Sequence, residues 1–338
     1  ERLKTDADLE TLALISGEAS RHLQDLDPDR LSADTGKKVA LALRQMGRVS
    51  QYQGKPEDAL EAFTRSRDFL SGLYKKFPDN ADVLLELGNA EYYIGNLHYA
   101  QGQYDIAMES MQTYHRLASK LLESDPGNPD WMLELSYSHN NLAAVQLQGG
   151  YKINEETLKH IAEAVRLMEE VVALSPEDEA VASVYANTLA WAADAQLQTC
   201  NLEGALTSRT RSKQLAEFSM LADPGNNDLK KNHAYALTGL ARVQSFTGQL
   251  DFAVQNLELA VSELQQLFAA DTSNFHYRDE ARDRRVMLAK LLAETGQLEL
   301  ARSMLQELEK EFEYTGEFID QNGYFRKELI NFLLAYTD

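Results

Sequence analysis

Apolar side chains recur at helical spacing along almost the whole chain. In the stretch 103–123, for example, Leu117, Leu121 and Leu122 fall on one side of a helix. The pattern is interrupted only by short polar turns, and it therefore predicts pairs of long helices. The expected pairs are 36–53 with 56–76, 82–101 with 103–123, 130–148 with 155–173, 178–199 with 202–221, 228–247 with 250–269, and 276–295 with 298–312.

Two further apolar stretches predict helices at the ends of the array, a capping helix at 6–25 and another at 323–336. Such helices are expected because an uncapped array leaves an apolar face in water. Between them, at 36–312, the pattern predicts six units in one continuous solenoid over 1–338. Their expected ranges are 36–78, 82–126, 130–176, 178–224, 228–272 and 276–312.

Small residues mark each unit at the same offset. One series reads Gly47, Gly95, Ala143, Ala193, Ala241 and Ala289, and a second, seven residues later, reads Gly54, Gly102, Gly150, Cys200, Gly248 and Gly296. The step is 48 residues, with one step of 50 where the loop before a second helix is longer. A fixed period of this size is typical of a repeat solenoid.

The charge of the chain narrows the classes of partner. The 338 residues carry 33 basic and 53 acidic side chains, which gives a formal net charge of −20. Such a surface repels phosphate backbones, so nucleic acid is not expected as a partner. No apolar run is long enough for direct membrane insertion. Because the chain begins at Glu1 in what reads as a charged helix, we expect a soluble piece of a longer protein.

The order of residues within a unit resembles the tetratricopeptide repeat. The residues that carry the resemblance are Ile94-Gly95, Gly102, Ala107, Met111 and Pro126. It implies an all-α fold, a right-handed α-solenoid of antiparallel helix pairs in a superhelix. The turn Asp125-Pro126-Gly127-Asn128 before a long helix is similar to extended arrays attached to bacterial signalling proteins. The compartment, cytoplasmic or membrane-anchored, stays open.

In that family the first helix of each pair lines the ligand groove. Carried over by position, the resemblance implies a groove rich in Tyr, Asn and Arg. The residues so implied are Arg44, Arg48, Tyr52, Asn89, Tyr92, Asn96, Tyr99, Tyr137, Asn140, Asn141, Asn187, Tyr235 and Arg242. Asn pairs with a peptide backbone through a donor and an acceptor, and Tyr supplies rigid contact area. The alternative is that these side chains satisfy one another.

Signals of catalysis or cofactor binding are weak. The glycines Gly47 and Gly54 are too far apart for a phosphate-binding loop, and Pro56 stands where Ser or Thr would bind magnesium. The seven histidines contain no i, i+4 pair for zinc, so we expect no metal site and no cofactor. The single cysteine, Cys200, replaces a turn glycine, which favours a tolerated small residue over a reactive thiol.

The sequence thus predicts a non-catalytic scaffold or sensor module, part of a larger bacterial signalling protein. An extended protein or peptide segment would lie along the face of the first helices. Arg44 and Arg48, with Lys37 and Lys38 nearby, could instead attract an acidic segment. Two alternative functions stay open, a structural module that self-associates into a homo-oligomer and a small-molecule sensor.

Overall fold

The computed structural model describes residues 26–149, 153–272, 274–314 and 335. It divides into two compact units, Glu1–Val171 and Val172–Asp338, which are taken one at a time below. The expected helix at 6–25 lies outside the described residues, and so does the expected helix at 323–336 apart from Ala335. None of the described helices is long and apolar enough to cross a membrane.

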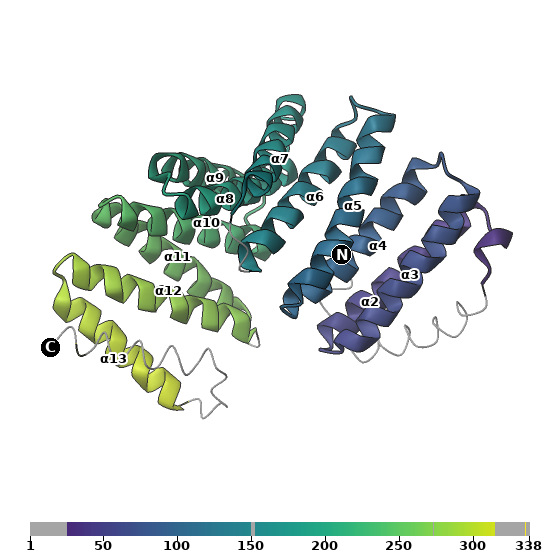
Figure 1. Cartoon of the computed structure of the whole chain (residues 1–338). Coiled ribbons are helices and arrows are strands. Elements are labelled where there is room, and N and C mark those ends of the chain that lie inside the picture. Colours follow the sequence, from purple (N-terminus) through teal and green to yellow (C-terminus); the bar gives the residue numbers. More distant parts are fainter. Residues whose placement is uncertain (1–25, 150–152, 273, 315–334, 336–338) are drawn as a thin grey trace. The chain divides into compact units, whose positions relative to one another are not determined.

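The first unit is a series of antiparallel helices that follow one another in chain order (Figure 1). Among the described residues, a short 3-10 helix, η2, comes first. The helices are η2 Pro28–Arg30, α2 Ala33–Tyr52, α3 Pro56–Lys76, α4 Ala81–Ala100, α5 Tyr104–Ser124, α6 Pro129–Gln148 and α7 Glu155–Leu174, whose last turn belongs to the second unit. Within this unit α2, α4 and α6 lie in one layer, and α3, α5 and α7 in the other.

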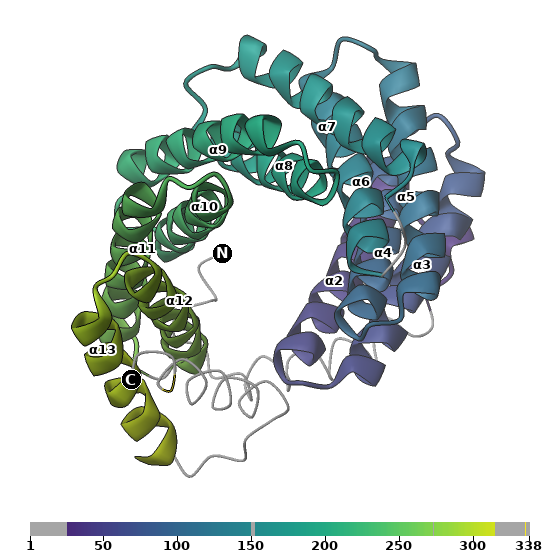
Figure 2. The same ribbon diagram turned by 60° about the vertical axis from the view of Figure 1, so that its left-hand side comes forward.

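The second unit repeats the same arrangement (Figure 2). Its helices in the described part are α8 Glu179–Gln198, α9 Leu202–Ala222, α10 Asn227–Phe246, α11 Leu250–Ala270, α12 Phe275–Glu294 and α13 Leu298–Tyr314. Each unit is thus built from consecutive antiparallel helix pairs, and the predicted all-α class is confirmed.

A polar residue begins most first helices of the pairs. Ser32, Asn80, Asn128, Asp178 and Asn226 each accept a hydrogen bond from a backbone N–H in the first turn of the helix that follows. Such N-caps satisfy donors that the helix cannot pair internally. Because these caps recur with the period of the repeat, the first helix of each pair begins at the same position within its repeat.

Small residues let the two helices of a pair approach closely. A Cβ atom added to Gly47 on α2 would lie 2.4 Å from Cε1 of the fully buried Phe63 on α3, and one added to Gly95 would lie 3.0 Å from Cε of Met111. The turns between the helices need a left-handed residue. Gly54 and Gly102 have φ angles of 70° and 72° there.

Candidate functional site

Helix α4 carries a stripe of Asn and Tyr on one side. Asn89, Tyr92, Asn96 and Tyr99 are spaced by three or four residues, so they fall on the same face of the helix. All four are half-buried. The Tyr92 ring centroid is 5.9 Å from that of Tyr114 on α5, and it packs against the apolar cluster around Leu142. The rings are therefore held in place while part of each side chain still faces solvent.

Helix α6 adds residues to the same surface. Tyr137 packs against the same apolar cluster as Tyr92 and Tyr99. Asn141 is half-buried and its Nδ2 donates to the Tyr137 carbonyl at 2.8 Å, which leaves its Oδ1 as an acceptor. Asn140, in contrast, is only 6% exposed, so its side chain is part of the interior. We call Asn89, Tyr92, Asn96, Tyr99, Tyr137 and Asn141 the Asn/Tyr face.

Two amides of the Asn/Tyr face have no internal partner. Within the described part of the chain, the side chains of Asn89 and Asn96 make no hydrogen bond, although both are half-buried. Each amide offers one acceptor and two donor hydrogens. They lie seven residues, or about 10.5 Å along the helix axis, apart. This arrangement can receive a backbone or side chain that supplies complementary groups.

Two cations of α2, Lys37 and Arg44, are already paired with carboxylates of α4. Arg44 bonds to Glu86, and its guanidinium carbon lies 5.6 Å from the ring centroid of Tyr93. Lys37 bonds to Asp82. Arg44 and Lys37 are thus engaged within the unit, which leaves less positive charge for an acidic segment than the sequence suggested. The Tyr52 side chain lies outside the description, and Arg48 Nη1 lies 3.4 Å from Gln45 Oε1.

Beside the Asn/Tyr face lies a buried hydrogen-bonded pair. The Tyr114 hydroxyl donates to Glu134 Oε2 at 2.8 Å. Burial raises the pKa of the Glu134 carboxyl above its usual range, although the bond from Tyr114 opposes the shift. Burial, and after it the Glu134 charge, raises the pKa of Tyr137 to about 12. Tyr137 is therefore a neutral hydroxyl, able to donate a hydrogen bond, throughout the neutral range.

The predicted residues of the second unit do not make a comparable surface. Asn187 is exposed on α8, and Ala190 stands where α4 has Tyr92. Tyr235 on α10 lies 5.2 Å beneath the Arg284 guanidinium, and its hydroxyl is 3.3 Å from His276 Nε2. Burial raises the pKa of Tyr235 to about 12. Arg242 is exposed, with its Nη2 3.9 Å from Asp194.

A buried arginine of the second unit was missed by sequence reasoning. Arg209 on α9 is 8% exposed and donates to Asp194 Oδ1 at 2.7 Å. It fills the space beside Gly239, where an added Cβ would lie 2.3 Å from Arg209 Nη1. Gly239 on α10 was the signal in the sequence, because a residue without a side chain leaves room for the Arg209 guanidinium. Arg209 thus anchors Asp194, the residue that Arg242 also approaches.

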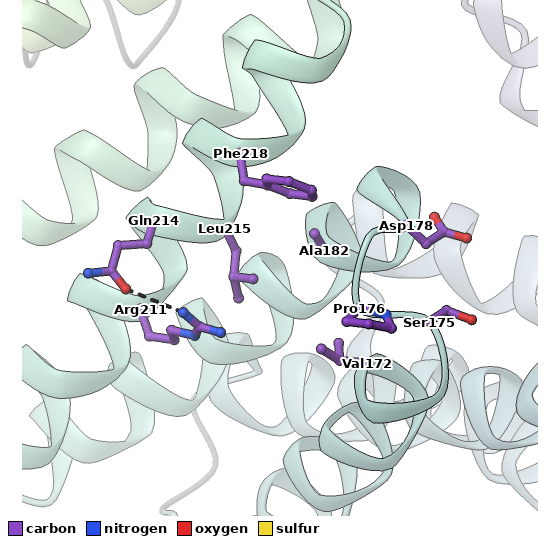
Figure 3. A pocket seen from close by; sticks show the side chains of 9 residues that line it. All are labelled: Val172, Ser175, Pro176, Asp178, Ala182, Arg211, Gln214, Leu215 and Phe218. Atoms are coloured by element: carbon purple, nitrogen blue, oxygen red, sulfur yellow. Dashed lines mark hydrogen bonds between the residues drawn. The ribbon is translucent and has the colours of Figure 1, made fainter.

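The second unit also holds an open cavity of about 280 Å³. Figure 3 shows it between α9, the turn at 175–178 and the start of α8. Phe218 and Leu215 face Ala182, Pro176 and Val172 across it, and Arg211 Nη1 donates to Gln214 Oε1 at 3.5 Å on one side. Its lining contains none of the predicted groove residues.

Comparison with known proteins identifies the fold. No protein-family model and no curated protein matches the chain. Among solved structures, a signal transduction ATPase with numerous domains (STAND) protein with a tetratricopeptide repeat sensor, from Pyrococcus horikoshii, aligns with a TM-score of 0.58. The identity is 12%, over 97% of this chain and 45% of that protein. This chain therefore spans less than half of that structure.

A second structure agrees in fold. The hypoxic regulator of sterol synthesis Nro1, described as a nuclear import adaptor, aligns with a TM-score of 0.55 and 13% identity. The match covers 94% of this chain and 98% of that one. At such low identity the likeness concerns the fold alone. The predicted resemblance to tetratricopeptide repeat arrays is confirmed at that level.

Proposed function

We propose that this chain is a non-catalytic protein-interaction module and that an extended segment of a partner protein binds along the Asn/Tyr face of the first unit. The observation that carries the proposal is the pair of unpartnered amides, Asn89 and Asn96, beside tyrosines held by packing. A preformed surface loses little conformational entropy on binding. Tyr contributes apolar area together with a hydroxyl donor, and Asn can bond to a peptide backbone both as a donor and as an acceptor.

Analogy of fold supports the same class of function. One similar structure is described as a nuclear import adaptor and another has a tetratricopeptide repeat sensor. This support concerns the class of function, a protein-interaction module, and not the identity of the partner. The turn Asp125-Pro126-Gly127-Asn128 is similar to extended arrays attached to bacterial signalling proteins, and on that resemblance we propose a sensing or scaffolding role within such a larger protein.

Charge indicates the chemistry of the partner segment. The chain carries a net charge of −20, and Arg44 and Lys37 are already bonded to carboxylates. A segment that carries Lys or Arg is attracted to such a surface, whereas an acidic one is repelled. We therefore propose a basic or neutral segment as the occupant.

Selection from a random-peptide display library on the full chain tests the proposal. We expect selected peptides to bind the wild type and to lose at least tenfold in affinity with Asn89→Ala/Asn96→Ala. Two hydrogen bonds of about 1 kcal/mol each correspond to a loss of that size. Asn187→Ala is the matched control, since it removes an exposed amide at the equivalent position of α8. Equal losses in both variants, or no selected peptide, would contradict the proposal.

A further inference from the structure

Three histidines from three successive helices lie together in the first unit: His115 on α5, His139 on α6 and His160 on α7. The ring centroids are 4.5 Å apart for His115 and His139, and 5.0 Å for His139 and His160. Each ring offers one nitrogen, and the three nitrogens lie within 4.8 Å of one another. The expectation of no metal site considered only pairs along one helix, so it did not address such a cluster.

Ser138 fixes the tautomer of one member. The Ser138 hydroxyl donates to the Leu135 carbonyl at 2.7 Å, so its proton is already used. Its oxygen lies 2.9 Å from His115 Nδ1 and can only accept there. His115 therefore carries its proton on Nδ1 and presents the lone pair of Nε2. A hydrogen bond that orients a histidine through its other nitrogen is typical of metal ligands.

The other two histidines share a single hydrogen bond. His139 Nδ1 and His160 Nδ1 are 2.7 Å apart, so one ring donates N–H and the other accepts. A cation that takes both lone pairs would replace this bond once the donating ring carries its proton on Nε2. No proton is lost from the site in that exchange.

The surroundings of the cluster favour neutral imidazole. His139 is buried and the other two rings are half-buried, so the site is sheltered but not closed to solvent. Burial lowers the pKa of all three rings, that of His139 to about 3. The nearby Arg166 is held by Glu163 and Glu170 at 2.9 and 2.6 Å, which balances its charge.

We infer that His115, His139 and His160 form a binding site for a divalent transition-metal ion of the zinc class. Imidazole nitrogen is the ligand that zinc, copper and nickel share. At Zn–N distances of about 2.0–2.1 Å, tetrahedral ligand nitrogens are about 3.3 Å apart. The present separations are 4.8 Å or less and include 2.7 Å between the Nδ1 atoms of His139 and His160, so rotation of the side chains would bring the three nitrogens to that spacing. Three ligands leave a fourth position open to water or to a group from a partner.

Such an ion would join α5, α6 and α7, three helices that contribute one ligand each. Because the ion binds the folded unit and not an extended chain, it should also stabilise the fold. The site shares no residue with the Asn/Tyr face, so each proposal can fail without the other.

Zinc titration of the tag-free full chain, stripped with a chelator and dialysed, tests the site. We expect one zinc ion per chain by competition with a chromophoric chelator, and a rise in melting temperature when zinc is added. His160→Gln and His115→Ala should each weaken zinc binding at least tenfold. His276→Ala is the control, since it removes an exposed histidine of the second unit.

Both cluster variants alter half-buried residues, and circular dichroism without metal checks that they fold. Cobalt(II) substituted for zinc supplies a second readout, since a nitrogen-ligated tetrahedral ion has strong visible absorption that the His160→Gln variant should lose. No saturable binding of zinc by the wild type would overturn the inference. So would equal affinities of His160→Gln and His276→Ala for zinc.

Discussion

The carboxylate of Glu134 lies half-buried at the edge of the Asn/Tyr face, with the hydroxyl of the buried Tyr114 as its hydrogen-bond donor. Burial is the larger influence on this carboxyl and it raises its pKa, because the charged form loses hydration. A group whose pKa is higher in the folded chain than in the unfolded chain stabilises the fold at pH values below its unfolded pKa. That stabilisation is lost as the pH rises through its folded pKa. At neutral pH the ionised Glu134 is therefore a cost to the fold.

We expect Glu134→Gln to raise the free energy of unfolding relative to wild type at about pH 7.5, and by less at about pH 4, near the ordinary Glu pKa. The amide oxygen still accepts from Tyr114, so the variant removes the charge and keeps the acceptor. Urea unfolding at the two pH values measures the difference. Glu109→Gln, an exposed substitution on α5, should show no such pH dependence. A gain that is the same at both pH values would contradict the argument.

At the scale of residues, the sequence predicts which side chains of one helix share a face, but not which side chains of different helices meet. Asn89, Tyr92 and Asn96 lie on one helix, so their common face follows from helical spacing alone. The Arg44–Glu86 pair joins α2 to α4, 42 residues apart, and spacing says nothing about which rotamers meet. The carry-over by position also included Asn140, which is buried. Whether the Asn/Tyr face binds a peptide stays a prediction.

At the scale of helices, local rules were enough to predict the class of fold. The small residues at the crossings and the glycines in the turns act within one pair, so a fixed period in the sequence becomes a fixed geometry. The His115, His139 and His160 cluster needed three helices at once, and no motif along one helix indicates it. Sites whose residues come from several helices are therefore not predicted by patterns along a single helix.

The turn between α8 and α9 departs from its counterparts. Cys200 has a φ angle of 59°, whereas Gly248 and Gly296 occupy equivalent turns with φ angles of 74° and 83°. A Cβ atom costs about 1–2 kcal/mol in the left-handed region. Part of that cost persists in this turn because Cys200 is exposed and gains little from packing.

We expect Cys200→Gly to stabilise the chain by about 0.5–1 kcal/mol, since relief of the left-handed strain exceeds the added entropy of the unfolded chain. The midpoint of urea unfolding should move to higher concentration with an unchanged slope. Cys200→Ala keeps a Cβ atom and serves as the control, so it should stay close to wild type. A gain with Ala equal to that with Gly would instead implicate the thiol.

Across the whole chain, the dominant physical feature is its charge of −20. Like-charged copies repel, and a large net charge keeps proteins monomeric. The same field favours cationic partners, so it acts against self-association and for the proposed binding of a basic segment. These two effects weaken together as salt screens them, because the Debye length falls from about 30 Å at 0.01 M to about 10 Å at 0.1 M.

We therefore expect light scattering of the full chain to give the monomer mass of 38.0 kDa across a hundredfold concentration range at low salt. The affinity for selected basic peptides should fall as the salt concentration rises from about 0.01 to about 0.1 M, because the attraction is screened. A mass that rises with concentration at low salt would show that contacts between copies outweigh the repulsion. The self-association alternative would then take precedence over the peptide proposal, and competition between selected peptides and association would show whether both use the Asn/Tyr face.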